Sequence, residues 1–293
     1  MEEYSGKRTE DKISAIEIPE PISDALSAGA SLAISISGGK DSQAMLYALE
    51  RERKAQGWTG YIFAIHAHLG RMEWPQSLAH CERICADINV PLIIVRRPQG
   101  DLLQEMQERM VKLQGTGKPH FPDSKNRYCT SHHKTSQIDK ALRTHELIIS
   151  AEGLRAEESP ARAKRPAWEY RTQICTRQRL GYTWRPIINW TEDQVWREMG
   201  SSSADIQQRR EMYRSGDYHG AFTGWAGHPA YIMGNQRLSC AICVLASRND
   251  IINGARCNSG LWRALVAMED ESGFSFRQDL RLGSLQLQEE VTA

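Results

Sequence analysis

The sequence SGGKDS at residues 37–42 has the composition of a turn that binds an anion. It follows the apolar run 32–36 and precedes the helical pattern 43–49, which predicts a strand, a tight turn and a helix start. Two glycines let backbone N–H groups point inward, and the helix N-terminus adds free donors and partial positive charge. The stretch predicts a phosphate site, although its glycine spacing differs from GxxxxGK[ST]. The alternative is a glycine turn without a ligand.

Two further polar stretches follow predicted strands. HAHLGRMEWP at 66–75 comes after the apolar run 61–66, and AEGLRAEESPAR at 151–162 comes after the run 146–150. Gly153 permits close approach of the backbone to a ligand. Glu157 and Glu158 either meet a magnesium ion on nucleotide phosphates or favour the start of a helix through its dipole.

The cysteines form the third group of chemically active residues. Cys240 and Cys243 make a CxxC pair, Cys257 follows fourteen residues later, and Cys129 lies far upstream. This spacing suits an iron–sulfur cluster or a tetrahedral zinc ion, and a free redox dithiol is a third interpretation. We assign Cys129, Cys240, Cys243 and Cys257 as ligands, with Cys175 as the competitor for the fourth position.

The elements that must position these residues alternate between strand and helix. Helical patterns are expected at 21–28, from the turn to about 56, at 75–88 and at 101–114, and strands at 32–36, 61–66, 90–95 and 146–150. Such alternation predicts a doubly wound α/β fold with a mostly parallel sheet. Because ligands bind at the carboxyl ends of parallel strands, we expect the three polar stretches to converge at one edge. We divide the chain into a tail (1–27), a nucleotide-binding domain (28–200) and a mostly helical, cysteine-containing region (201–293).

The composition excludes several classes of protein. The chain has 293 residues, of which 25% are charged and 40% hydrophobic, as in soluble globular proteins. No apolar run approaches the ~20 residues of a membrane helix, and the polar N-terminus is unlike a secretion signal, so we expect a cytoplasmic protein without membrane contact. An odd number of cysteines then indicates no disulfide framework. Cys81 and Cys85 share a helix face and are expected to be buried.

The charge pattern leaves the partner open. The net charge is +1, but eight basic residues lie between Arg155 and Arg185. They form either a solvated basic face or a contact surface for a polyanion.

The ordered set of motifs resembles one known family. SGGKDS, HAHLGRMEWP, RYCTSHHK at 127–134, GLRAEESPAR, RPIINWTEDQVW and SCAIC follow one another as in the phosphoadenosine phosphosulfate (PAPS) reductase family, within the PP-loop ATP pyrophosphatase superfamily. The resemblance covers roughly residues 28–285 and implies the adenine nucleotide alpha hydrolase-like fold. Two features depart from the reductases. The segment 281–288 has no cysteine to attack a sulfonucleotide, and the intact SGGKDS is typical of relatives that cleave ATP.

The resemblance implies an enzyme that binds ATP with magnesium, cleaves it to AMP and pyrophosphate, and adenylates a substrate for sulfur transfer. Relatives that modify DNA or transfer sulfur hold a [4Fe–4S] cluster on comparable cysteines. PAPS or adenylyl sulfate reduction, with sulfite release, is one alternative, and a non-catalytic nucleotide-binding subunit is another. The acceptor can be DNA, tRNA or a small metabolite, and the sulfur donor a cysteine desulfurase or thioredoxin. The implied catalytic residues are Lys40 and Asp41, and the implied nucleotide-binding residues are Ser37, Gly38, Gly39, Lys40, Asp41, Ser42, His66, His68, Gly153, Arg155, Glu157, Glu158 and Arg162.

Overall fold

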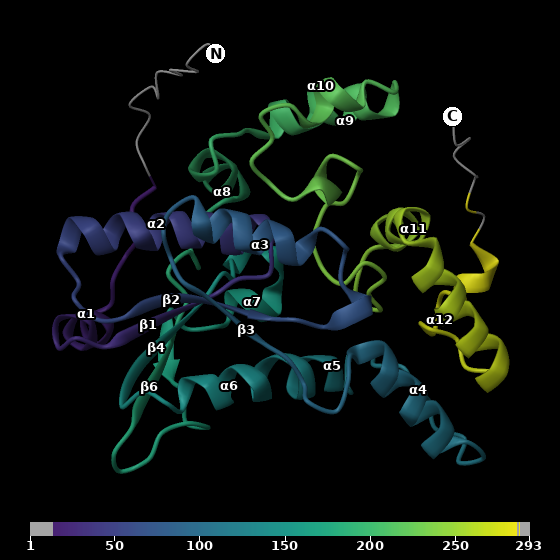
Figure 1. Cartoon of the computed structure of the whole chain (residues 1–293), viewed down its shortest axis with the longest axis horizontal. Helices are drawn as coiled ribbons and strands as arrows, with labels where there is room; N and C mark the ends of the chain where they lie inside the picture. Colours follow the sequence, from purple (N-terminus) through teal and green to yellow (C-terminus); the bar gives the residue numbers. More distant parts are fainter. Residues whose placement is uncertain (1–13, 286, 288–293) are drawn as a thin grey trace.

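The centre of the fold is a six-stranded sheet with the order β3-β2-β1-β4-β6-β5 (Figure 1). The computed structural model describes residues 14–285 and 287, so the first part of the predicted tail lies outside it. Neighbouring strands run parallel except β5, which pairs antiparallel with β6 at the edge. The predicted mostly parallel α/β fold is confirmed. The strands are β1 (Ser31–Ser35), β2 (Ile62–Ala67), β3 (Leu92–Val95), β4 (Leu147–Glu152), β5 (Trp168–Tyr170) and β6 (Leu180–Trp184).

Helices cover both faces of this sheet. In Figure 1, α2 and α3 lie above it, α6 lies below it, and α11 and α12 stand beside it. Within residues 14–285 and 287, no helix combines the length and the apolar character that crossing a membrane requires. The longer helices are α1 (Glu20–Ser27), α2 (Lys40–Gln56), α3 (Ser77–Ala86), α4 (Leu102–Leu113), α6 (Ser136–Leu142), α8 (Glu192–Glu198), α9 (Ser203–Arg214), α11 (Arg248–Cys257) and α12 (Ser259–Ser272). The short ones are η1 (Gly70–Met72), α5 (Tyr128–Thr130), the π-helix η2 (Ser131–Thr135), η3 (Ala156–Glu158), α7 (Pro160–Ala163), α10 (Tyr218–Phe222), η4 (Pro229–Tyr231) and η5 (Leu282–Ser284).

The strand order places the switch point of the sheet next to β1. The chain proceeds from β1 to β2 and β3 on one side, and β4 pairs with β1 on the other. Ser35 therefore aligns with Ile65 of β2 and with Glu152 of β4. The stretches that follow these three strands meet at one edge of the sheet, where a doubly wound fold binds its ligand.

The C-terminal helices share a core with the rest of the chain. One hydrophobic cluster joins Leu103 and Met106 of α4 to Ile242, Ile251 of α11 and Leu265 of α12. The C-terminal region is helical, as expected, and it packs against α4. The division at residue 201 stays a prediction.

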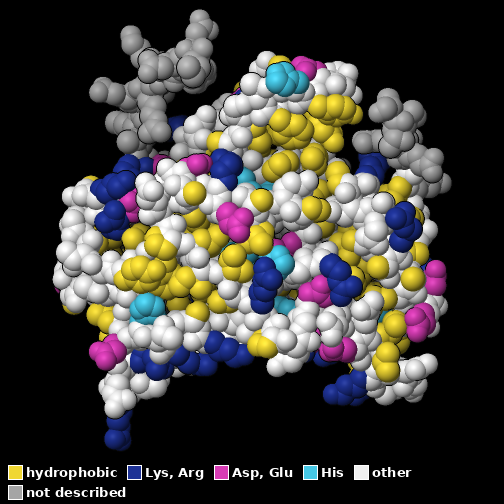
Figure 2. All heavy atoms as spheres, viewed as in Figure 1, with side chains coloured by type: hydrophobic (Ala, Val, Ile, Leu, Met, Phe, Trp, Pro, Cys, Tyr) yellow, Lys and Arg dark blue, Asp and Glu magenta, His cyan; other side chains and the backbone are white. Residues whose placement is uncertain are grey.

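The basic run at 155–185 is only partly exposed, since Lys164, Arg165 and Arg177 are exposed and other members are buried. Arg155, Arg171 and Arg185 are nearly buried, with 4%, 7% and 4% of their side chains exposed. Figure 2 shows Lys and Arg in separate groups with Asp and Glu among them, rather than in one basic field on this face. A buried guanidinium needs a carboxylate partner, and arginines of this run have such partners. The pairs are Arg155–Asp41, Arg162–Glu158, Arg171–Asp139 and Arg185–Glu169.

Candidate nucleotide site

The turn at 37–42 joins β1 to α2, as predicted. Gly38 has a φ of +77°, in the left-handed region that favours glycine. The Ser42 hydroxyl donates to the Gly39 carbonyl at 2.8 Å and accepts from the Ser37 N–H at 3.2 Å. Gly39 is the N-cap of α2. Because glycine carries no capping side chain, N–H groups of the first helical turn are left to bind another acceptor.

Lys40 supplies a buried cation at this turn. Only 4% of its side chain is exposed, and its ammonium lies 3.5 Å from Asp41 and 3.4 Å from Glu192 of α8. The ammonium also lies 5.7 Å and 5.6 Å from the ring centroids of Trp196 and Tyr231. Carboxylates and aromatic faces compensate a cation for its burial. The charge is thereby held next to the N-terminus of α2.

The end of β4 packs directly against the start of α2. A Cβ atom on Gly153 would lie 3.0 Å from both Cα and N of Ser42, so only glycine fits without displacement. The absence of a side chain at Gly153 therefore lets its backbone contact the start of α2, beside the predicted ligand site. Arg155 follows and pairs with Asp41 and Glu157, while Glu157 also accepts the N–H of Glu192 at 2.7 Å.

A polar cavity of about 540 Å³ opens beside these residues. Trp196, Ser203, Ile206 and Gln236 form part of its wall. Cations and carboxylates face each other in it, which suits a ligand that brings both negative charge and a metal ion. The charged residues that line it are Lys40, Arg155, Arg210 and Arg237 on the one hand, and Glu157, Glu158 and Glu192 on the other.

The end of β2 carries a histidine pair held by one carboxylate. His66 is buried, and its Nδ1 lies 3.1 Å from the Ile36 carbonyl at the end of β1. Its Nε2 lies 3.2 Å from Glu73, whose carboxylate is also 3.7 Å from His68. Burial lowers the pKa of His68, and the Glu73 carboxylate opposes this effect. His66 thus supports the strand ends, while His68 remains partly exposed.

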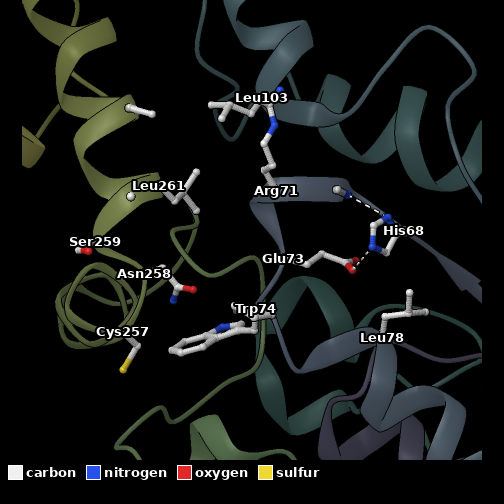
Figure 3. A pocket seen from close by; sticks show the side chains of 14 residues that line it. His68, Arg71, Glu73, Trp74, Leu78, Leu103, Cys257, Asn258, Ser259 and Leu261 are labelled. Atoms are coloured by element: carbon white, nitrogen blue, oxygen red, sulfur yellow. Dashed lines mark hydrogen bonds and ion pairs between the residues drawn. The ribbon is translucent and has the colours of Figure 1, made fainter.

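A second cavity of about 630 Å³ lies on the His68 side (Figure 3). One wall comes from the stretch after β2, with Glu73 and Trp74, and the opposite wall from α11 and α12, with Asn258 and Leu261. The backbone N–H of Ala241, between the two cysteines of the CxxC pair, donates to the Met72 carbonyl at 2.9 Å. The CxxC segment therefore contacts the stretch after β2 that forms one wall of the cavity.

Two buried histidines pack against the turn at 37–42. A Cβ atom on Gly38 would lie 3.4 Å from His80 and 3.6 Å from His228. Nδ1 of His228 accepts the Ala230 N–H at 3.1 Å, and its Nε2 lies 3.2 Å from the Ser77 hydroxyl. Burial lowers the pKa of His80 to about 4 and that of His228 to about 3. A proton on Nδ1 of His228 would point at the Ala230 N–H, so the fold accepts only the neutral ring.

These histidines predict instability in acid. Above pH ~6.5 both rings are neutral in the folded and the unfolded chain, and below it only the unfolded chain binds the protons. The free energy of unfolding should therefore fall as the pH falls, by about 2 kcal/mol per histidine at pH 5. Urea unfolding at pH 7.5 and at pH 5.0 tests this expectation. Between these two pH values, the free energy of unfolding of His228→Gln should fall less than that of the native chain. His219→Gln, at an exposed position, should match the native loss. Equal losses in all three proteins would contradict the conclusion that burial of neutral His228 makes the fold less stable in acid.

Three of the predicted metal ligands come together. Cys240 and Cys243 share a hydrogen bond, which lowers the pKa of Cys243 and raises that of Cys240. Both also interact electrostatically with Cys129. Lys134 lies close enough to favour the thiolates of all three. In residues 14–285 and 287, no three His, Cys, Asp or Glu side chains are close enough as they stand to hold a metal ion. Cysteine thiolates are the kind of ligand that zinc ions and iron–sulfur clusters bind. The three cysteine side chains would have to move closer together to hold either group.

The other cysteines have different surroundings. Cys257, at the end of α11, borders the second cavity, with its sulfur 4.0 Å from that of Met233. Cys175 bonds instead to Arg171 and Gly181 beside β6. Cys81 and Cys85 are buried, as expected, and burial raises the pKa of both thiols.

Several residues at the site were missed from the sequence. Glu192 and Trp196 of α8 were not among the predicted site residues, and both contact Lys40. Tyr231 and Arg237 come from a stretch with no readable motif. Most of the predicted nucleotide-binding residues gather around the turn, and two histidines, His66 and His68, lie at the neighbouring strand end. The residues around the turn are Ser37 to Ser42, Gly153, Arg155, Glu157, Glu158 and Arg162.

Comparison with known proteins gives a family match over most of the fold. The family model of the phosphoadenosine phosphosulfate reductase domain matches residues 31–217. A relative from Escherichia phage 186, an "uncharacterized 37.8 kDa protein in gpa 5′ region", is 28% identical over 254 residues, with 74% of this chain and 68% of the relative covered.

Solved structures show weaker likeness. The U34-tRNA thiolase NcsA from Methanococcus maripaludis with its [4Fe-4S] cluster aligns with a TM-score of 0.43 and 17% identity over 80% of this chain and 83% of that one. The FMN adenylyltransferase of Candida glabrata aligns with a TM-score of 0.36 and 13% identity, over 62% of this chain and about half (52%) of that one. The NAD+ synthetase of Burkholderia pseudomallei aligns with a TM-score of 0.30 and 15% identity, over 45% and 56% of the two chains.

Proposed function

Because the chain belongs to the phosphoadenosine phosphosulfate reductase domain family, we propose that it is an enzyme that cleaves ATP to AMP and pyrophosphate and adenylates an acceptor for sulfur transfer. The observation that carries this proposal is Lys40, a buried cation at the N-terminus of α2 that also lines the 540 Å³ cavity. A fixed positive charge beside free N–H donors is what a departing pyrophosphate requires.

In the proposed reaction the β- and γ-phosphates lie on residues 37–42. A nucleophilic atom of the acceptor attacks the α-phosphorus, the bond to the bridging oxygen breaks, and pyrophosphate leaves beside Lys40. The Ser37 hydroxyl and the N–H groups of Gly38 and Gly39 would hold its oxygens, and the Ser42 hydroxyl would join them by releasing the Gly39 carbonyl. Asp41 orients Lys40 and Arg155, since it pairs with both.

The neighbouring strand ends would hold the rest of the nucleotide. His66 supports this edge from inside, and the partly exposed His68 with the backbone after β2 would line the adenosine. Arg155 and Arg162 would form the wall of the nucleotide site on the side away from His68. Glu157 and Glu158 fit a magnesium ion carried by the phosphates, because this ion prefers oxygen ligands and takes only one or two carboxylates from the protein.

The second cavity is the proposed acceptor site. It is bordered by His68 on one side and by Cys257 and Asn258, at the end of α11, on the other (Figure 3). A cluster on Cys129, Cys240 and Cys243, with Cys257 as the proposed fourth ligand and zinc as the alternative metal, would supply the sulfur chemistry there. DNA, tRNA or a small metabolite would be the acceptor, and a cysteine desulfurase or thioredoxin the source of sulfur or electrons.

Product analysis tests this function. Protein purified and reconstituted without oxygen is incubated with ATP and magnesium, or with PAPS, in the presence of DNA, tRNA or small-molecule acceptors. AMP and pyrophosphate from ATP support the proposal. Sulfite from PAPS identifies a reductase instead, and ATP binding without any product identifies a nucleotide-binding subunit.

Filling the second cavity should separate acceptor use from nucleotide binding. Ala264 of α12 lines this cavity, so Ala264→Phe should lower acceptor-dependent pyrophosphate release at least ~10-fold by excluding the acceptor. The dissociation constant for ATP should stay within about threefold. Ala267→Phe, at an exposed position of the same helix, is the matched control and should change neither quantity. A large loss of ATP affinity in Ala264→Phe would place the nucleotide in this cavity and contradict the assignment.

A further inference from the structure

Tyr231 brings a phenol from the C-terminal region to the phosphate turn. Its hydroxyl oxygen accepts the backbone N–H of Lys40 at 2.9 Å, although the two residues are 191 positions apart in the chain. This N–H belongs to the first residue of α2. The phenol therefore lies among the donors that would hold the pyrophosphate.

The position of this phenol is fixed by its surroundings. Tyr231 is 1% exposed, and its ring packs edge-on against Trp196 with centroids 5.2 Å apart. Arg210 donates to the Tyr231 carbonyl at 2.8 Å and holds the backbone of η4. The hydroxyl oxygen also lies 3.5 Å from the place where a Cβ atom of Gly39 would stand. A side chain packed in this way has little freedom to turn its hydroxyl away.

The hydroxyl group of Tyr231 also carries a proton that it can donate. A tyrosine hydroxyl has one donor and can accept two bonds. Its oxygen accepts from Lys40 and is also hydrogen-bonded by the backbone of Leu238, and in the part of the chain that the structure describes (14–285 and 287) no hydrogen bond is found in which the phenol donates. A buried donor without a partner costs free energy that a bound acceptor would recover.

We propose that Tyr231 donates its hydroxyl proton to a phosphate oxygen of the nucleotide, so that the C-terminal region completes the pyrophosphate site of residues 37–42. This inference rests on the proposed ATP site. A phosphate oxygen that met the N–H groups of the turn would lie next to the phenol oxygen, which already contacts one of these groups. Burial raises the pKa of Tyr231 above its usual range, so the phenol keeps its proton when an anion arrives.

A phenol that served only as an acceptor would have the opposite effect on phosphate binding. If Tyr231 only satisfied the Lys40 N–H, it would compete with phosphate for that donor. Its removal would then free the N–H and strengthen anion binding. The sign of the change in affinity therefore decides between the two roles.

Calorimetric titration with inorganic pyrophosphate plus magnesium, and separately with adenosine, tests the proposal on Tyr231→Phe. Loss of one hydrogen bond to a charged group should weaken pyrophosphate binding about tenfold or more and leave adenosine binding unchanged. Tyr47→Phe is the matched control, because this phenol lies on α2, the helix whose first N–H group Tyr231 contacts, and meets the Gln43 side chain instead of the turn. The control should bind both ligands like the native protein.

Equal or tighter pyrophosphate binding by Tyr231→Phe would overturn the inference. Failure of the native protein to bind either pyrophosphate or ATP would overturn the proposed function as well, so the two failures are distinguishable. If Tyr231→Phe does not fold, crystals of the native protein with pyrophosphate decide. The phenol oxygen should lie within ~3.0 Å of a phosphate oxygen, and a separation above ~3.5 Å would contradict the donor role.

Discussion

Lys40→Ala should reduce pyrophosphate release from ATP by about 10²–10³-fold, as expected for the loss of one preorganised group that stabilises a developing negative charge. The structure gives a second reason for a large effect. Without the ammonium, Asp41 and Glu192 would face the phosphates directly, since both now lie within 3.5 Å of the Lys40 nitrogen. Repulsion from these carboxylates would add to the loss of attraction. Rates are measured by pyrophosphate release at saturating and at low ATP.

Two companion variants sharpen this prediction. Lys54→Ala removes a lysine of the same helix α2 whose side chain is 63% exposed, and it should leave the rate unchanged. Adding Glu192→Gln to Lys40→Ala should restore part of the ATP affinity and little of the rate, because it removes repulsion without replacing the cation. A Lys40→Ala protein that folds and still releases pyrophosphate at the native rate would contradict the role of Lys40.

Cys243→Ser should abolish the broad absorption near ~400 nm of anaerobically reconstituted protein, together with sulfur transfer. ATP cleavage should persist, because the cysteine segment contacts the turn through Tyr231 and Leu238 and not through the thiols. Absorption spectra and iron content measure the first effect, and AMP formation measures the second.

Cys175→Ser is the matched control for this experiment. Cys175 bonds to Arg171 and Gly181, away from the other thiols. It should keep the absorption, while Cys129→Ser and Cys240→Ser should lose it. If Cys175→Ser lost the absorption and Cys243→Ser kept it, the proposed ligand set would be wrong. Zinc in the native protein without visible absorption would favour the alternative metal.

The sequence predicted those parts of the fold that depend on local patterns. The turn at 37–42 could be predicted because its glycines, strand and helix are contiguous, and the buried strands β1, β2 and β4 because their apolar runs are short and uninterrupted. The β5–β6 hairpin was not anticipated, since its strands alternate aromatic residues with polar ones and Gly181. Within the site, Glu192 and Trp196 could not be assigned because a capped amphipathic helix has the same pattern whether or not one end meets a ligand.

Contacts between residues far apart in the chain account for the parts of the site that the sequence did not reveal. Arg171 and Arg185 look like surface charges in the sequence, yet Asp139 and Glu169 neutralise them inside the fold. Tyr231 meets Lys40 from 191 positions away, and no local pattern marks it. A buried pair of this kind becomes visible only when the C-terminal region is folded against α2.

The central claim is that residues 37–42 hold the β- and γ-phosphates of ATP. A crystal structure with magnesium and an ATP analogue that resists cleavage tests it most directly, because it needs no acceptor. We expect the terminal phosphates within hydrogen-bond distance of the Gly39 N–H and the Lys40 ammonium, with the adenosine at His68. Phosphates bound elsewhere, or no binding of the analogue at millimolar concentration, would contradict the claim.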